Sequence, residues 1–199
     1  MNDDDHEDRE GRRCRQRQKQ TGGRAFSRLL VIAAAVLMAW GLKRYYADAA
    51  VEDLTWILRP TTGLVSVVTG EHFTWQAGEG YVSRSHLFLI EKSCAGVNFM
   101  IAAFGMLVIA FAHRARPGAV PLGVLTGSLV AGYSAAVLIN AVRIAIAMWL
   151  AAHPGSLPAL TAPDVHRLEG IIVYFGGLVL LHEAAMQFDR HVLAPGRTS

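Results

Sequence analysis

Residues 93–112 read SCAGVNFMIAAFGMLVIAFA, and this stretch decides how the chain folds. It begins just after the polar residues Glu91 and Lys92, and it ends before a basic cluster that starts at His113. About 20 consecutive apolar residues are needed for a helix to cross the hydrocarbon core of a membrane. The sequence therefore predicts a transmembrane helix here, with the thiol of Cys94 at its polar edge.

The composition of the whole chain also indicates a membrane protein. Of its 199 residues, 52% are hydrophobic and only 18% are Asp, Glu, Lys or Arg, and the apolar residues gather in long runs. Further runs at 26–42, 119–152 and 170–185 are candidate spans. The run 119–152 is too long for one perpendicular helix, so it either tilts and protrudes or breaks near Gly132 or Asn140. We expect an all-α integral membrane fold with about four transmembrane helices.

Residues 43–92 form the longest segment between the expected spans. Pro60 lies between two short apolar runs, so any helix around it should be short or broken. Residues 73–76 and 81–83 flank a glycine-containing turn and predict a small β-hairpin. We expect this segment to form a short interfacial and hairpin element on the extracytoplasmic side.

The charges outside the spans predict the orientation of the chain. Residues 1–25 combine an acidic start with a basic block, which predicts a disordered cytoplasmic tail. Residues 26–188 are expected to form a single transmembrane domain. Since four spans return the chain to its starting side, the tail 189–199 should also be cytoplasmic.

This topology brings three chemically active residues to the same depth. Cys94 lies at the outer end of the second span, and Arg143 lies near the outer boundary of the third. His166 stands just before the fourth span, which also begins on the outside. All three are therefore expected at the extracytoplasmic rim of the membrane.

The chemistry of these three side chains is complementary. A helix N-terminus or a nearby cation stabilises a thiolate, so Cys94 is a candidate nucleophile. Arg143 is a candidate to stabilise the thiolate or the oxyanion formed from an attacked carbonyl. His166 is a candidate general acid and base that gives a proton to a leaving amine. Such a site would cut or transfer a peptide bond beside the membrane surface.

Three neighbouring polar residues are candidates for helper roles. Asn98 and Asn140 each lie one helical turn from a proposed catalytic residue and are candidates to position the peptide backbone of a substrate. Glu169 lies one turn after His166 and is a candidate to orient its ring. Helix capping and simple solvation are the alternatives for all three.

Other interpretations of the same residues stay open. A cysteine in a span is often a small packing residue, and an arginine near a helix end often reaches to the headgroups. The chain would then be a non-catalytic transporter subunit or an assembly scaffold. A metal site using Cys94 with His72, His86 or His166 has no supporting ligand spacing, so we expect no metal or other cofactor. No basic-aromatic pattern of the kind that binds nucleic acid is evident.

These motifs resemble those of the exosortase/archaeosortase family of integral membrane transpeptidases. The resemblance is carried by KSCAGVN at 92–98, NAVRI at 140–144, and His166 ahead of Gly170. It covers about residues 54–186. In the family, the corresponding positions are the nucleophilic cysteine, the catalytic arginine and a histidine. The compact length and the sequence RPTTGLVS from Arg59 are similar to the exosortase K type.

The resemblance implies a bacterial inner-membrane enzyme that processes C-terminal sorting signals. Its substrates would be secreted proteins tethered by a C-terminal span, and Cys94 would form a thioester that an unidentified acceptor nucleophile resolves. The chain departs from the family in two ways. Many members have around eight spans, whereas four are expected here. The family motif is often Cys-Ser-Gly, whereas this chain has Ala95 between Cys94 and Gly96.

Overall fold

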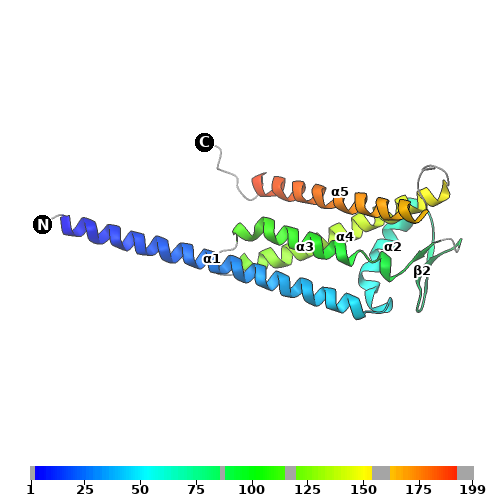
Figure 1. The fold of residues 1–199 in the computed structure, drawn as a ribbon, viewed down its shortest axis with the longest axis horizontal. Helices are drawn as coiled ribbons and strands as arrows, with labels where there is room; N and C mark the ends of the chain where they lie inside the picture. Colours follow the sequence, from blue (N-terminus) through cyan, green and yellow to red (C-terminus); the bar gives the residue numbers. More distant parts are fainter. Residues whose placement is uncertain (1–2, 86–87, 115–119, 154–161, 192–199) are drawn as a thin grey trace.

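Four long helices form an elongated bundle in the computed structural model (Figure 1). They are α1 (Asp3–Asp48), α3 (Val97–Phe111), α4 (Val120–Ala152) and α5 (Ala162–His191). The structure describes residues 3–85, 88–114, 120–153 and 162–191, with the backbone alone for residues 3–21, 24, 120 and 162–166.

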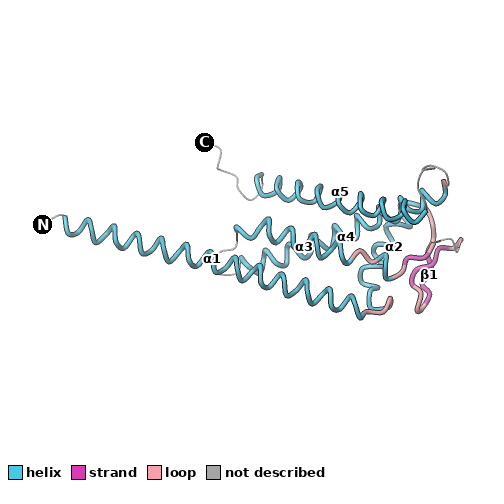
Figure 2. The backbone as a smooth tube through the Cα atoms, in the orientation of Figure 1, coloured by secondary structure: helices cyan, strands magenta, loops and turns pink. Residues whose placement is uncertain are grey.

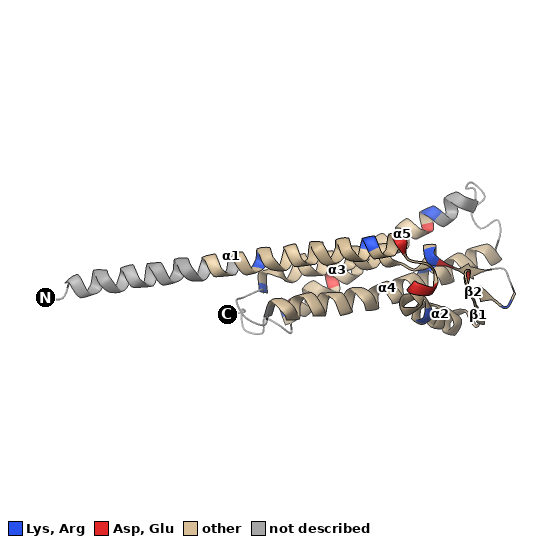
Figure 3. Cartoon of the chain, turned by 90° about the horizontal axis from the view of Figure 1, so that it is seen from below, with Lys and Arg blue, Asp and Glu red and all other residues tan. Residues whose placement is uncertain are grey.

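Each long helix belongs to a stretch that is long and apolar enough to cross a membrane, which confirms the prediction of a mostly helical chain with four candidate spans. These stretches are Ala25–Asp48, Lys92–Arg114, Pro121–Ala152 and Arg167–His191. Figure 3 shows most of the charged residues of the described part toward the two ends of the bundle, with uncharged helix between them.

Helix α1 begins far earlier than we predicted. Residues 1–25 were expected to be a disordered tail, but the helical backbone starts at Asp3 and continues without a break to Asp48. The helix passes through the glycine pair Gly22 and Gly23 without ending there, since no proline follows and each residue added to an existing helix gains a hydrogen bond. The first part of α1 extends beyond the other helices (Figure 1).

Helix α4 is a single helix, which settles the alternative left open by the length of the run 119–152. It passes through Gly132 and Asn140 without a break. A Cβ atom at Gly132 would lie 3.1 Å from the backbone nitrogen of Phe104 in α3. The missing side chain therefore serves the close crossing of α3 and α4 and does not mark the end of a helix.

Helix α2 (Thr55–Thr69) passes through Pro60, so of the two predicted alternatives, a short or a broken helix, the structure has a short unbroken helix of 15 residues. Proline has no N–H, and it leaves the carbonyl four residues earlier, that of Trp56, without its helical donor. The hydroxyl of Tyr133 in α4 donates a hydrogen bond to this carbonyl at 2.9 Å, and its ring stacks on that of Trp56. A tertiary contact thus satisfies the group that the proline leaves open.

A three-stranded antiparallel sheet follows α2 at the same end of the bundle (Figure 2). Strand β1 (Phe73–Gln76) pairs with β2 (Gly80–Ser83), with Phe73 opposite Ser83. The predicted hairpin is therefore confirmed. The third strand, β3 (Leu89–Ile90), pairs with β2 and leads directly into the turn that carries Cys94.

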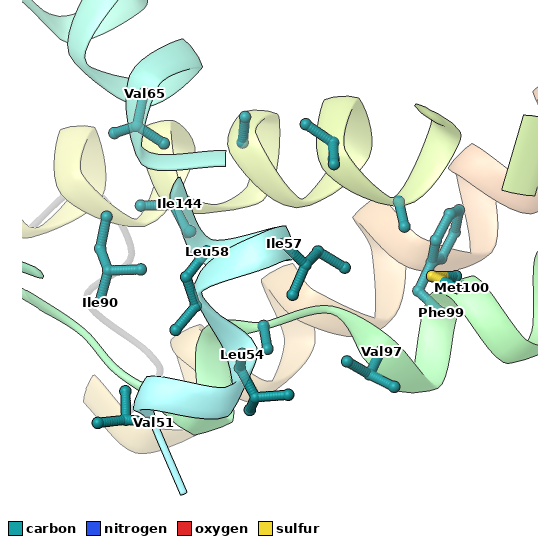
Figure 4. Close-up of a cluster of buried hydrophobic side chains, with 14 of the residues drawn as sticks. Val51, Leu54, Ile57, Leu58, Val65, Ile90, Val97, Phe99, Met100 and Ile144 are labelled. Atoms are coloured by element: carbon teal, nitrogen blue, oxygen red, sulfur yellow. The ribbon is translucent and has the colours of Figure 1, made fainter. Parts of the chain in front are cut away.

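The main hydrophobic core lies at this end of the bundle, between α2 and the helices α3 and α4 (Figure 4). Leu54, Ile57, Leu58 and Val65 are fully buried, and they come from α2 and from the short 3-10 helix η1 (Glu52–Leu54) before it. Cys94 packs against the same core. The segment before α3 therefore rests on a closely packed base.

Candidate functional site

Cys94 does not lie in α3, although we expected it at the helix N-terminus. It ends a separate 3-10 turn, η2 (Lys92–Cys94), and Gly96 caps α3 with a φ of 68°. Non-glycine residues rarely adopt this left-handed conformation. A Cβ at Gly96 would also lie 3.0 Å from Cγ of Asn140. Glycine is therefore required at this position both by the backbone and by the neighbouring helix.

Asn140 connects the cysteine turn to α4. Its side chain is completely buried, and its Nδ2 donates a hydrogen bond to the backbone carbonyl of Cys94. Its Oδ1 accepts a hydrogen bond of 2.8 Å from the hydroxyl of Tyr174 in α5. We predicted that Asn140 would position a substrate backbone, but it positions the backbone of the cysteine itself.

Arg143 lies one turn further along α4 and contacts the same tyrosine. Its Nη1 donates to the Tyr174 hydroxyl at 3.2 Å, and its guanidinium lies 5.2 Å from the centroid of the Tyr174 ring. Its Nε lies 3.8 Å from Oε2 of Glu169, and both side chains are largely buried. A continuous series of contacts therefore runs from Cys94 through Asn140 and Tyr174 to Arg143 and Glu169.

The structure gives the other predicted residues different surroundings. Glu169 contacts Arg143, and its predicted role in orienting the ring of His166 stays a prediction. Asn98 is exposed, and its Oδ1 accepts a 2.6 Å hydrogen bond from Nζ of Lys43 in α1. His166 belongs to α5 and stands three residues before Glu169. The structure describes its backbone but not its side chain.

The C-terminal end of α1 holds the cysteine turn from the other side. The hydroxyl of Tyr46 donates to the carbonyl of Lys92 at 3.0 Å. The Nζ of Lys92 donates in turn to the carbonyls of Ala47 and Ala49, at 3.1 and 2.6 Å. These carbonyls lie at the negative end of the α1 dipole, where a cation is favourable. The turn that contains Cys94 is thus held between α1 and α4.

Sequence reasoning did not find Tyr46, Lys92 or Tyr174 as site residues. Lys92 was noted only at the polar edge of a span and as the first residue of the KSCAGVN motif. Tyr174 had a usable signal, since it lies one helical turn after Gly170 and on the same face of the last span. A single tyrosine in an apolar run whose hydroxyl needs a buried partner is a reason to expect such a contact.

A pocket of about 400 Å³ opens beside this network. It is bounded by α1, by the cysteine turn and the start of α3, and by α4 and α5. Its lining includes Tyr46, Ser93, Asn98, Arg143, Arg167 and Tyr174. Two arginines therefore line a hollow that Ser93 and Gly96, on either side of Cys94 in the chain, also line. The sulfur of Cys94 lies 3.7 Å from the hydroxyl of Ser93. Cations in a partly buried site stabilise negative charge that develops on a bound group.

The described residues contain no group of three or more His, Cys, Asp and Glu side chains that could hold a metal ion. No protein-family model matches the chain, and no characterised protein or solved structure shows significant similarity to it. The function is therefore argued from the residues of the site and from the motif resemblance alone.

Proposed function

We propose that this protein is a membrane-embedded cysteine peptidase or transpeptidase of the exosortase type. It would cleave C-terminal sorting signals of secreted, membrane-tethered proteins at the outer face of the bacterial inner membrane. One observation carries the proposal. Asn140 and Tyr174 link the turn of Cys94 to the guanidinium of Arg143, although these four residues come from three different elements. A preorganised link between a nucleophile and a charge-stabilising group is what acyl-transfer chemistry needs.

The proposed reaction begins when the thiol of Cys94 loses its proton to the imidazole of His166. The thiolate attacks the carbonyl carbon of the scissile peptide bond, and Arg143 stabilises the negative oxygen that forms. The C–N bond then breaks, and His166 returns the proton to the leaving amine. The resulting thioester on Cys94 is resolved by an amine, a hydroxyl or water, which restores the thiol.

The contacts around Arg143 support its role as a stabiliser of charge. Tyr174 and Glu169 fix the direction of the guanidinium while it remains part of the pocket lining. A side chain that is already oriented does not have to lose conformational freedom during the reaction. Glu169 in this proposal orients Arg143.

The distribution of charge supports an extracytoplasmic site. The basic block at residues 12–28, with Arg114 and Arg190, belongs to the end of the spans away from Cys94, where the positive-inside rule predicts the cytoplasm; Lys43 and Arg44, at the Cys94 end, run against this rule. The proposed site then faces the outside, where a secreted substrate arrives. The substrate and the enzyme share one membrane, which raises their effective concentration, so the pocket does not need a high affinity of its own.

A coexpression experiment tests the proposal. The wild-type protein, Cys94→Ser, Cys94→Ala and the matched control Cys14→Ser are each expressed with candidate secreted proteins that carry a C-terminal membrane anchor. Mass spectrometry then measures new C-termini on the candidates and an acyl adduct on Cys94. We expect processing by the wild type and by Cys14→Ser, and none by either Cys94 variant. Full processing by Cys94→Ala at normal expression would exclude a thiol nucleophile.

A further inference from the structure

A second hollow, of about 460 Å³, lies between α3, α4 and α5. It lies toward the C-terminal end of α3, and so at the opposite end of the bundle from Cys94 (Figure 1). We call it the apolar groove, because nearly all of the side chains that form it are hydrophobic. Its lining includes Leu107, Phe111, Gly127, Leu181, Ala185 and Phe188.

The face that α4 presents to the apolar groove is made of small residues. Gly123, Gly127 and Ala131 recur at every fourth position, and a Cβ at either glycine would meet no atom within 4 Å. The groove is therefore open along α4, and it has room for an extended hydrocarbon chain.

One polar group lies within the apolar lining. Ser128 is only 4% exposed, and its hydroxyl has no hydrogen-bond partner among the described residues. Buried hydroxyl groups are normally hydrogen-bonded, because a donor that gives up water without a new partner is unfavourable. The oxygen is covered by its neighbours, so it does not face the open groove and does not bear on what the groove holds.

The rim of the apolar groove carries a cluster of charged groups. Nε of Arg114 lies 2.5 Å from Oδ1 of Asp189, and Nε2 of His113 lies 3.7 Å from the same oxygen. Arg28 of α1 donates a hydrogen bond to the backbone carbonyl of His113 at 3.2 Å. His113 and Arg114 thus lie against one carboxylate, and Arg28 lies beside His113. Two arginines against one aspartate leave a net positive charge at this end of the spans, which favours an anionic headgroup.

We propose that the apolar groove binds one acyl chain of an anionic phospholipid. The chain lies along Gly123, Gly127 and Ala131, and the phosphate lies at the rim beside Arg114. This site depends on the chain being embedded in a membrane, and it is independent of the proposed peptidase activity.

Native mass spectrometry of the purified full-length protein tests the site directly. The protein is stripped of lipid in detergent and titrated with dioleoyl phosphatidylglycerol or with dioleoyl phosphatidylcholine, which has the same chains and no net charge. We expect a one-to-one adduct that forms about five- to tenfold more tightly with the anionic lipid. Equal binding of the two lipids, or many adducts without a preferred first one, would overturn the proposal.

Filling the groove separates a specific site from general lipid contact. Gly127→Leu places a side chain in the open space of the groove and should weaken the adduct by at least about tenfold. Gly105→Leu is the matched control, because a Cβ at this α3 glycine also meets nothing within 4 Å and the residue does not line the groove. Gly123→Leu is a second filling variant in case Gly127→Leu does not fold. An unchanged adduct in a folded filling variant would refute the site.

The rim charges give a test in which two substitutions act in opposite directions. Arg114→Gln should reduce the preference for phosphatidylglycerol, whereas Asp189→Asn should increase it, because the first removes a positive charge and the second a negative one. If the pair were only structural, both variants would lose the lipid together, and that result counts against the proposal.

The oligomeric state tests a different occupant. If the wild type is a dimer and Gly127→Leu is a monomer with unchanged lipid binding, the groove holds a second copy of the chain and the lipid proposal is wrong.

Discussion

The pocket beside Cys94 and the apolar groove lie along the same three helices, but they are built in different ways. In the pocket, directional hydrogen bonds connect the cysteine turn with α4 and α5. In the groove, apolar side chains and small residues form the walls, and the charged groups are confined to the rim. A hydrogen-bonded network specifies one geometry, whereas an apolar surface accepts any chain of suitable width. The pocket is therefore suited to chemistry, and the groove to holding a flexible ligand.

The substitution with the largest expected effect is at Arg143, and it should change substrate processing without changing lipid binding. Arg143→Gln should reduce substrate processing by about a hundred- to a thousandfold, because it removes the donor proposed to stabilise the oxyanion. Lipid binding in the apolar groove should not change. Processing is measured as the rate at which the new C-terminus appears in cells with equal amounts of the two enzymes.

A double substitution controls for loss of the fold. Arg143→Gln leaves Glu169 without its buried partner, which costs about 3–5 kcal/mol in typical buried ion pairs. Arg143→Met combined with Glu169→Met should recover most of this thermal stability and none of the processing. If the stabilised double variant processed substrate as the wild type does, Arg143 would have no chemical role.

The next prediction compares two positions on α4, one at the cysteine turn and one at the apolar groove. Asn140→Leu keeps a side chain of similar size but leaves the carbonyl of Cys94 without its donor. We expect the free energy of unfolding to fall by about 1–3 kcal/mol and processing to fall by roughly ten- to a hundredfold as the turn loses its orientation. Thermal unfolding and the processing assay measure the two effects.

Ser128→Ala is the matched control at the groove end of α4. Its hydroxyl is buried and has no partner among the described residues, so its removal should not lower stability and should raise it by up to about 1–3 kcal/mol. A result in which Asn140→Leu and Ser128→Ala are equally mild would mean that the hydrogen bond to Cys94 does not hold the turn.

Two glycines of the α3 segment should respond in opposite ways to the same substitution. Gly96→Ala forces a side chain into a left-handed conformation and against Asn140, and it should cost about 1–2 kcal/mol and slow processing. Gly105→Ala lies in open space within the helix and should raise stability by up to about 1 kcal/mol. Thermal unfolding compares the two. A neutral Gly96→Ala would show that the cysteine turn tolerates rearrangement.

The smallest effect distinguishes a hydroxyl of the network from one that only supports the fold. Tyr174→Phe removes the hydroxyl that joins Asn140 to Arg143 but keeps the ring, which packs on Phe99. We expect a loss of about 1 kcal/mol and a roughly five- to tenfold slower reaction. Tyr133→Phe loses a similar amount of stability, because Trp56 loses its donor, but it should leave processing unchanged. Equal processing by the two variants would remove Tyr174 from the proposed mechanism.

Much of the fold could be predicted from the sequence because its signals are local. The apolar runs predict the spans, the glycine-containing turn predicts the hairpin, and the edge of one run marks the position of Cys94. Pro60 shows where local signals fail. Its restriction on the backbone is real, but the partner that compensates for it, Tyr133, is 77 residues away in the sequence.

The sequence by itself determined which segments are apolar, which residues are able to react and where along the spans they lie, since these follow from composition and length. Only the tertiary structure decided how they are connected. Asn140 and Cys94 are 46 residues apart, and Tyr174 is 34 residues from Asn140. The contacts form because packing of α3, α4 and α5 brings buried polar groups together in surroundings without water, where each must find a partner.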